Sequence, residues 1–295
     1  MPVPLTIIGG FLGSGKTTLL NRILSQPQGR RFAVIVNDFG DIAIDEDLIA
    51  SHDGQTIALA NGCVCCTIGD NFLRTLLDTL KRDPQPDHIV VEASGVADPA
   101  RIAEIAAIEK DLTLDGVIIL ADAAGLERQV ADSRLVDTVE RQVDSADIVV
   151  LNKTDLADEM KVAACRDWIR RRRPNLPITT THQANAPFEL LFGIEKRPAN
   201  DDHAHSHDIP FETQAFETDQ LVPKNDLEKA LRDLAPHIVR AKGILKTGGD
   251  NWSVVQMVGE RIDWSAAASR EGEVSRLVVI GPAPLPDLSQ LDWLF

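Results

Sequence analysis

The sequence predicts an α/β protein, with a mostly parallel sheet covered by helices on both faces and a smaller α+β domain after it. The first 180 residues alternate short Val/Ile-rich runs with helical patterns, which is typical of a parallel sheet. The runs are continuous rather than alternating, as in strands buried on both faces. The length of 295 residues suggests about two domains, at roughly 150 residues per domain.

Six strands are expected in the first domain. They are the apolar runs at residues 5–8, 32–36, 88–91, 116–120, 147–151 and 176–180. A helix is expected over residues 72–80, where apolar side chains recur at helical spacing. Short strands that alternate with helices favour right-handed crossover units and therefore parallel strand pairing.

The alternation of strands and helices stops at residues 185–210, which contain three prolines, two adjacent aspartates and three histidines. We interpret this segment as a linker between a domain of residues 1–184 and a domain of residues 211–295. In the second domain, helical spacing of apolar residues predicts a helix over 227–234. Strand-like runs at 238–246, 253–258 and 276–280 complete the expected α+β unit.

The charge of the chain restricts its partners. Asp and Glu (45) outnumber Lys and Arg (30), which gives a net charge of −15. Nucleic acids and anionic membranes require a cationic face, so neither is an expected partner. No run of about 20 apolar residues is present, and the N-terminus lacks a signal-peptide pattern. Three of the four cysteines lie within four positions, which favours metal or redox chemistry in a cytoplasmic protein.

Residues 10–17, Gly-Phe-Leu-Gly-Ser-Gly-Lys-Thr, fit the phosphate-binding pattern G-x4-G-K-[ST] between a strand and a helix, which indicates a P-loop NTPase. The glycines let backbone N–H groups converge on phosphate oxygens, and the helix N-terminus adds partial positive charge. We expect Lys16 to reach the β and γ phosphates and Thr17 to ligate Mg²⁺. The expected nucleotide contacts here are Gly10, Gly13, Ser14, Gly15, Lys16, Thr17 and Thr18.

A later apolar strand ends in Glu92 and is followed by Gly95. P-loop proteins place a Mg²⁺-linked carboxylate at such a strand end, so Glu92 is expected to hold the metal through a water. The N–H of Gly95 is expected to approach the γ-phosphate. The alternative is that Glu92 caps the helix beginning near Asp98. Lys16, Glu92 and Asp38 are the residues expected to act in phosphate cleavage.

The sequence Asn152-Lys153-Thr154-Asp155 also follows an apolar strand and fits the N-K-x-D pattern of GTP-binding proteins. Asp155 can accept two hydrogen bonds from the ring N–H and exocyclic amine of guanine, a donor pair that adenine lacks. Asn152 is expected to brace the loop, and Lys153 to lie over the base. The alternative is that Asp155 serves only as a helix N-cap.

A cysteine-rich turn predicts a metal site at Cys63, Cys65 and Cys66, in a C-x-C-C pattern. Thiolates suit Zn²⁺, Cu⁺ or Fe–S clusters. The pattern lacks the second cysteine pair of a closed zinc site, so such a site stays open and can release its ion. The alternative is that the cysteines are buried as small hydrophobic residues.

Two further groups are candidate metal ligands. Asp38 and Asp41 follow the second strand, where P-loop GTPases keep a nucleotide-sensing switch. Either can complete the metal shell or orient the attacking water, and a solvated acidic loop fits equally well. The linker carries an alternating histidine tract, which is typical of metal binding but also of a solubilising segment. Its members are His203, His205 and His207.

Together these motifs resemble the CobW-type metallochaperone P-loop GTPases, which include zinc-regulated GTPase metalloprotein activators and CobW-like proteins of cobalamin synthesis. The resemblance covers nearly the whole chain. It is carried by G-G-F-L-G-S-G-K-T-T-L-L at 9–20, N-D-F-G-D at 37–41, N-G-C-V-C-C at 61–66, V-E-A-S-G-V-A-D-P at 91–99, N-K-T-D at 152–155 and V-R-A-K-G-I-L at 239–245.

The resemblance implies GTP hydrolysis coupled to the binding of a transition metal and its delivery to a client metalloprotein. Zn²⁺ is the default metal, with Co²⁺ or Fe²⁺ as alternatives. The resemblance also implies that the C-x-C-C cysteines supply the thiolates, and that Lys16, Thr17 and Glu92 bind GTP and Mg²⁺. Many members of the family carry Glu where Asp38 and Asp41 stand.

Other functions stay open at this point. The client could be a cobalt or iron enzyme, as in cobalamin synthesis or nitrile hydratase activation. A nucleotide-gated metal buffer would hardly turn over GTP. A P-loop small-molecule kinase would transfer phosphate to an acceptor other than water and would give the cysteines no role. The C-terminal domain is expected to contact the client or a second copy of the chain, which would make a homodimer.

Overall fold

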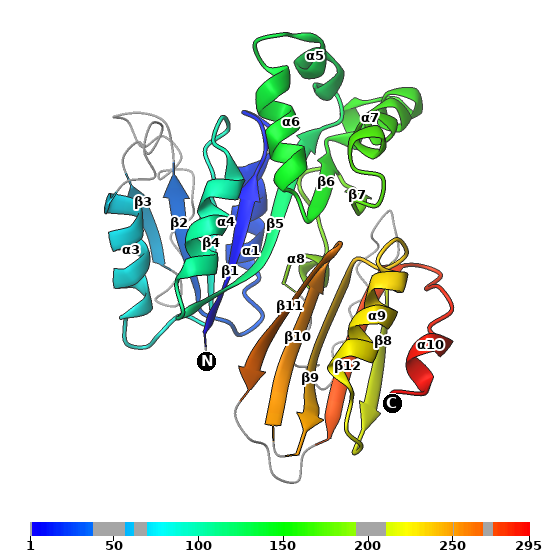
Figure 1. The fold of residues 1–295 in the computed structure, drawn as a ribbon. Helices are drawn as coiled ribbons and strands as arrows, with labels where there is room; N and C mark the ends of the chain where they lie inside the picture. Colours follow the sequence, from blue (N-terminus) through cyan, green and yellow to red (C-terminus); the bar gives the residue numbers. More distant parts are fainter. Residues whose placement is uncertain (1, 38–56, 62–69, 193–210, 250, 268–273) are drawn as a thin grey trace. The chain divides into compact units, whose positions relative to one another are not determined.

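The protein is represented by a computed structural model, drawn in Figure 1. It describes residues 2–37, 57–61, 70–192, 211–249, 251–267 and 274–295. The chain divides into two compact units, each of which is described by itself. Unit 1 comprises Met1–Pro174 and Ile178–Ala186, and unit 2 comprises Asn175–Pro177 and Pro187–Phe295.

Unit 1 is built on a seven-stranded sheet with the strand order β3-β2-β4-β1-β5-β6-β7. Its strands are β1 (Val3–Gly9), β2 (Phe32–Asn37), β3 (Ile57–Asn61), β4 (His88–Glu92), β5 (Leu112–Asp122), β6 (Ile148–Asn152) and β7 (Ile178–Thr180). All neighbouring strands pair in parallel. The predicted parallel sheet is confirmed. From the central strand β1 the chain moves first toward β2 and later toward β5, so the carboxyl end of β1 is where ligands of such sheets bind.

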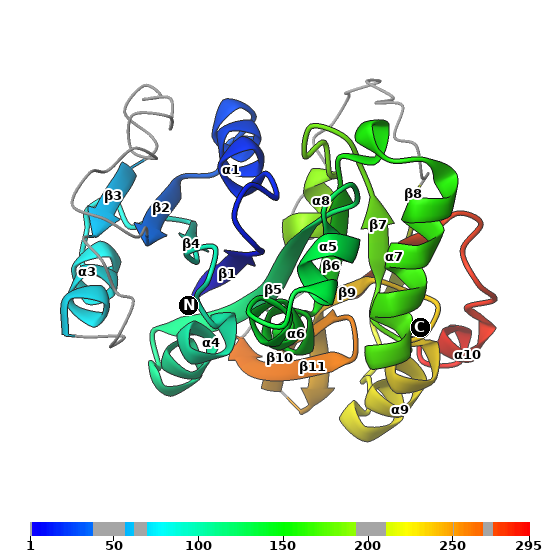
Figure 2. The same ribbon diagram turned by 90° about the horizontal axis from the view of Figure 1, so that it is seen from above.

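Helices cover both faces of this sheet. They are α1 (Lys16–Ser25), α3 (Asp70–Leu80), α4 (Pro99–Ile108), α5 (Leu126–Ala131), α6 (Val136–Ser145) and α7 (Glu159–Arg172). Figure 2 shows α1 on one face, with α3, α4 and α6 on the other. Every residue of β4 and of β6 is buried. The double coverage explains why these strands are continuous apolar runs.

Two details of the sheet differ from the sequence prediction. The strand β3 was not predicted, because alanine-rich Ile57–Asn61 has little intrinsic preference for strand. It is held by parallel pairing to β2, with Ala33 opposite Ile57. The strand β5 begins at Leu112 rather than near residue 116, and a register shift places Leu5 opposite Leu114 but Thr6 opposite Gly116.

The residue left over by this shift, Asp115, belongs to a buried polar cluster. Thr6 Oγ1 donates to Asp115 Oδ2 at 3.2 Å, so it accepts its 2.8 Å bond from His88 Nε2. The three side chains are at most 1% exposed. The β-bulge therefore places a carboxylate beside β1, where Thr6 hydrogen-bonds it and links it to His88 of β4.

Unit 2 contains a five-stranded antiparallel sheet with the order β11-β10-β9-β12-β8. Its elements are α8 (Phe188–Phe192), β8 (Phe211–Thr218), α9 (Lys224–Leu234), β9 (Arg240–Gly248), β10 (Asn251–Val258), β11 (Arg261–Ala267), β12 (Ser275–Pro282) and α10 (Ser289–Asp292). The predicted α+β character is confirmed. The two edge strands β8 and β11 were not predicted, because they are polar and mostly exposed or half-buried.

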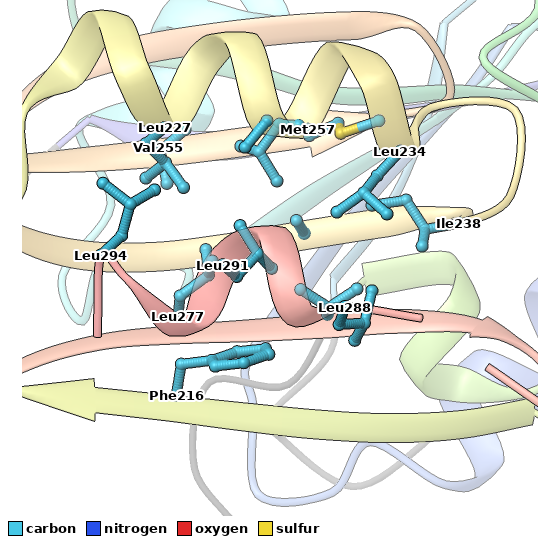
Figure 3. Packing of buried hydrophobic residues seen from close by; sticks show 14 of the residues in the cluster. Phe216, Leu227, Leu234, Ile238, Val255, Met257, Leu277, Leu288, Leu291 and Leu294 are labelled. Carbon is cyan, nitrogen blue, oxygen red and sulfur yellow. The ribbon is translucent and has the colours of Figure 1, made fainter. Parts of the chain in front are cut away.

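Alternate residues of the inner strands form the core of unit 2 with α9 and α10 (Figure 3). Leu227 and Leu234 of α9 and Leu291 of α10 pack against strand residues that include Val255 and Leu277. The helix predicted over residues 227–234 therefore buries its apolar face as expected. Of the helices in the described ranges, none has the length and apolar character needed to cross a membrane.

Candidate nucleotide-binding site

The loop between β1 and α1 has the backbone of a phosphate cradle. Gly10, Gly13 and Gly15 all have positive φ, at 133°, 76° and 107°. A Cβ atom on Gly10 would lie 2.2 Å from the Leu120 carbonyl oxygen, and one on Gly15 would lie 2.4 Å from Asn152 Nδ2. The loop therefore requires glycine for both conformation and space. The buried hydroxyl of Ser14 has no hydrogen-bond partner among the described residues, which suits a site for an anionic ligand.

Lys16 is the first residue of α1 and is buried. Its Nζ donates to the Gly10 carbonyl oxygen at 3.1 Å and to the Phe11 carbonyl oxygen at 3.5 Å. The ammonium group therefore lies over the loop, and its charge adds to the partial positive charge at the start of the helix. This is the arrangement that an incoming polyphosphate requires.

Thr17 and Glu92 come together from separate elements. Thr17 Oγ1, in the first turn of α1, donates to Glu92 Oε1 at 3.5 Å, and the carboxylate stands at the carboxyl end of buried β4. A hydroxyl and a carboxylate are the hard oxygen ligands that Mg²⁺ prefers. The residues present therefore fit a magnesium ion at the edge of the phosphate loop. The helix α4 is capped by Asp98, whose side chain accepts from the Ala100 N–H at 3.0 Å, so it does not use Glu92 as its cap.

The turn after Glu92 lies against the phosphate loop. A Cβ on Gly95 would come within 2.5 Å of Leu12 Cδ2 and 2.9 Å of the Leu12 backbone nitrogen. The other side of the turn is held by Gln142 of α6, whose Nε2 donates to the carbonyl oxygens of Gly95 and Ala97 at 3.1 and 3.3 Å. Gln142 lies outside every nucleotide motif of the sequence, so no sequence pattern marks it as a site residue.

At the end of β6, Asn152 joins two loops. Its Nδ2 donates to the Ser14 carbonyl oxygen of the phosphate loop at 2.9 Å, and its Oδ1 accepts from the Ala184 N–H at 2.9 Å. Only 2% of Asn152 is exposed. The expected bracing role of Asn152 thus has a geometric basis, and the brace connects the phosphate loop to the loop after β7.

The next residues of the motif lie at the surface of the same strand end. Lys153 has a left-handed backbone with φ 62°, and its Nζ donates to Asp122 Oδ2 at 2.9 Å. Thr154 Oγ1 donates to the Thr181 carbonyl oxygen at 3.1 Å, and Asp155 is exposed in the short 3-10 helix (Thr154–Leu156). The carboxylate of Asp155 is therefore accessible to a base. Asp122, which holds Lys153, was not selected from the sequence.

The loop after β7 is conformationally strained and tied to α1. Gln183 and Ala184 have positive φ values of 49° and 54°, which is uncommon for residues other than glycine. Arg22, in the last turn of α1, donates to the Gln183 carbonyl oxygen at 2.8 Å and to Asn185 Oδ1 at 3.2 Å. The first turn of α1 thus contacts the phosphate loop, and its last turn contacts the loop after β7.

The remaining predicted site residues lie outside the described residues. They are Asp38, Asp41, Cys63, Cys65, Cys66, His203, His205 and His207. Across the described ranges, no group of three or more His, Cys, Asp or Glu side chains could hold a metal ion. The predicted transition-metal site therefore rests on the sequence pattern.

The fourth cysteine, Cys165 of α7, lies beneath the Asp122 loop. Its Sγ donates to the Ala123 carbonyl oxygen at 3.6 Å, and the residue is only 3% exposed. Burial raises the pKa of the Cys165 thiol to about 11, with smaller contributions from the nearby carboxylates of Glu127 and Asp122. Cys165 is therefore a packed, protonated thiol at neutral pH.

Known protein families account for both units. Residues 4–180 match the nucleotide-binding domain of the CobW/HypB/UreG family, and residues 211–290 match the C-terminal domain of the cobalamin synthesis protein CobW. This chain belongs to the CobW/HypB/UreG family. The resemblance seen in the motifs and the prediction of a P-loop GTPase are confirmed by this membership. The exact domain boundaries at residues 184 and 210 stay predictions.

Relatives of the CobW/HypB/UreG family match over nearly the full chain. A protein of Sinorhizobium sp named "Zinc chaperone CobW" is 32% identical, over 95% of this chain and 92% of that protein. A protein of the same name from Pseudomonas aeruginosa is 34% identical, over 95% and 87%. The solved structure of Zn(II)-bound YjiA GTPase from E. coli is similar with a TM-score of 0.50 and 26% identity, covering 100% of this chain and 99% of that one.

Proposed function

We propose that this chain is a GTP-hydrolysing metallochaperone that binds Zn²⁺ at Cys63, Cys65 and Cys66 in a GTP-dependent manner and delivers it to a client metalloprotein. The observation that carries the proposal is the likeness of 95% of the chain to two proteins named zinc chaperones. It is supported by a phosphate loop and an N-K-x-D motif that are physically joined through Asn152.

Recognition of the base is assigned to Asn152, Lys153 and Asp155. The exposed Asp155 carboxylate can accept both guanine donors, while adenine would leave it poorly paired. The Lys153 stem would lie over the base, positioned by Asp122. The backbone of the phosphate loop, with the side chains of Ser14, Lys16, Thr17 and Thr18, would hold the phosphates in the order that the sequence pattern predicts.

Hydrolysis transfers the γ-phosphoryl group from GTP to water, with cleavage of the bond to the β-phosphate oxygen, and yields GDP and phosphate. Lys16 neutralises charge that builds up on the phosphates. Thr17 and Glu92 would hold Mg²⁺, which when bound neutralises the same phosphate oxygens. Gly95 would present its N–H to the γ-phosphate, and Asp38 or Asp41 would orient the attacking water.

The transported metal would occupy a chemically separate site. Soft thiolates favour Zn²⁺ over Mg²⁺, whereas the Thr17–Glu92 oxygens favour Mg²⁺. The C-x-C-C turn lies in the sequence between the acidic loop and the Glu92 turn, so GTP would hold the thiolates in a binding geometry. After hydrolysis the loops relax and the ion passes to the client, with the tract His203, His205 and His207 as a further set of ligands on its route.

The test is a Zn²⁺ and Co²⁺ competition titration of reduced protein with Mg²⁺ and either GDP or a non-hydrolysable GTP analogue. The proposal predicts tight, thiolate-dependent binding with the analogue and weaker binding with GDP. By linkage, the metal must then increase the affinity for the analogue relative to GDP by the same factor. A variant with all three motif cysteines changed to serine is the control. Binding of equal affinity in both nucleotide states would refute the switch and indicate a metal buffer.

A further inference from the structure

We propose that Gln142 is a positioning residue for phosphate cleavage. It would hold the turn after Glu92 in place, so that turnover depends on an amide in the middle of α6. The proposal rests on the GTP hydrolysis proposed above, but it concerns a residue outside the nucleotide motifs.

The contacts of Gln142 suit this role. The residue is 2% exposed, and its Nε2 donates both to the Gly95 carbonyl oxygen at 3.1 Å and to the Ala97 carbonyl oxygen at 3.3 Å. A primary amide has two N–H donors, so one side chain can serve both carbonyls. Since the amide is buried, losing it would leave those carbonyls without their donor in a poorly hydrated environment.

The backbone on either side of the turn is already fixed. The Ala93 N–H donates to the Ile8 carbonyl oxygen at 2.8 Å, which continues the pairing of β4 with β1. Downstream, Asp98 caps α4. Gln142 holds the backbone between these two points, at Gly95 and Ala97, and Gly95 is also the residue that lies against Leu12 of the phosphate loop.

The close contact between Gly95 and Leu12 makes the position of the turn critical. The distance between Gly95 and Leu12 leaves no room for a Cβ on Gly95. A small displacement of the turn therefore changes the distance between the Gly95 backbone and the phosphate loop. Displacing a reacting group by about 1 Å can lower a rate by roughly 100-fold. Gln142 would therefore affect the chemical step more than nucleotide affinity.

The helix that carries Gln142 is itself well anchored. Arg172 of α7 contacts Glu140 of α6 at 3.0 Å and makes two bonds of 2.6 Å to the Asp144 carboxylate. These ion pairs flank Gln142 by two residues on each side. Because these ion pairs hold α6 in place, the position of the Gln142 amide relative to the turn is fixed.

The test compares Gln142→Met with Gln85→Met. Methionine has a similar length and no amide donors, so it tests the donors with little change in packing. Gln85 is a matched control, because it is exposed, precedes the amino end of β4 while Glu92 stands at the carboxyl end, and donates a single 3.2 Å bond to the Leu80 carbonyl oxygen. The measurements are kcat for GTP, the GDP dissociation constant, and hydrogen exchange of the amides of residues 93–97.

For Gln142→Met we expect kcat to fall by roughly 10- to 100-fold, the GDP dissociation constant to change by less than about threefold, and exchange of the turn amides to accelerate. Gln85→Met should match the wild type. Unchanged exchange in Gln142→Met, or parallel losses in kcat and GDP affinity, would overturn the positioning role. A wild type that binds but does not hydrolyse GTP, with faster exchange in the variant, would refute the hydrolysis and with it the role of Gln142 in cleavage, and it would leave Gln142 only a structural role in holding the turn.

Discussion

The Asn152 bridge allows a quantitative prediction for Asn152→Ala. The amide makes two hydrogen bonds of 2.9 Å, and both Asn152 and Ala184 are almost completely buried. Each bond contributes about 1 kcal/mol net, and a buried N–H left unpaired at Ala184 costs about 1–3 kcal/mol more. The expected total is about 3–5 kcal/mol, divided between the free energy of unfolding and nucleotide affinity.

Two measurements test this magnitude, namely urea unfolding without nucleotide and the dissociation constant for GDP. If the whole loss appeared in binding, it would weaken affinity by roughly 150- to 5,000-fold. Asn175→Ala is the control, because Asn175 is exposed and its amide makes one bond of 2.9 Å to Glu260. The control should change stability by less than about 0.5 kcal/mol.

Asn152→Asp separates the two halves of the bridge. The carboxylate can still accept from the Ala184 N–H, but it has no donor for the Ser14 carbonyl oxygen and brings a charge into a buried site. We expect it to be at least as damaging as the alanine variant. A combined loss below about 0.5 kcal/mol in Asn152→Ala would refute the reasoning that this side chain couples the two loops.

Two further predictions concern Asp155 and Cys165. Asp155→Asn should shift nucleotide preference from guanine toward xanthine by at least about tenfold, because an amide can donate to the xanthine 2-carbonyl. Competition binding with GDP and xanthosine diphosphate measures this preference as a ratio of affinities. An unchanged ratio would show that Asp155 does not read the base. In the folded protein, Cys165 should resist iodoacetamide at pH 8, because burial raises its pKa to about 11. As the pH rises, the thiol ionises in the unfolded chain at a lower pH than in the folded chain. The wild type should therefore lose stability relative to Cys165→Ala as the pH rises from 9.0 to about 11. Urea unfolding measures both stabilities, and parallel pH profiles of the two proteins would contradict the raised pKa.

The nucleotide motifs can be recognised in the sequence because each one is short and local. The glycines at positions 10, 13 and 15 are required by their own positive φ values, and those at positions 10 and 15 also by close neighbouring atoms. The strand β3 was missed because its stability comes from pairing with β2 rather than from its own residues. The edge strands of unit 2 were missed for the related reason that polar strands give no apolar periodicity.

The short helix α8 was also missed, because its own residues carry too little pattern to predict it. It lies in the stretch interpreted as a linker, where proline and polar residues dominate, but Leu190, Leu191 and Phe192 are buried. The Leu191 carbonyl oxygen accepts a 3.0 Å bond from buried Arg240. Apolar residues in a run of five are too few to establish a helical period.

The sequence by itself determined the fold class, the family and the motifs that are proposed to bind phosphate and base, because those features are encoded in contiguous patterns. Only the tertiary structure identified the long-range contacts that support the site. Gln142 lies 47 residues from Gly95, Asn152 lies 138 from Ser14, and Arg22 lies 161 from Gln183. In each of these contacts the acceptor is a backbone carbonyl, a group that every residue carries, so no residue type marks the partner and only the folded chain reveals the pair.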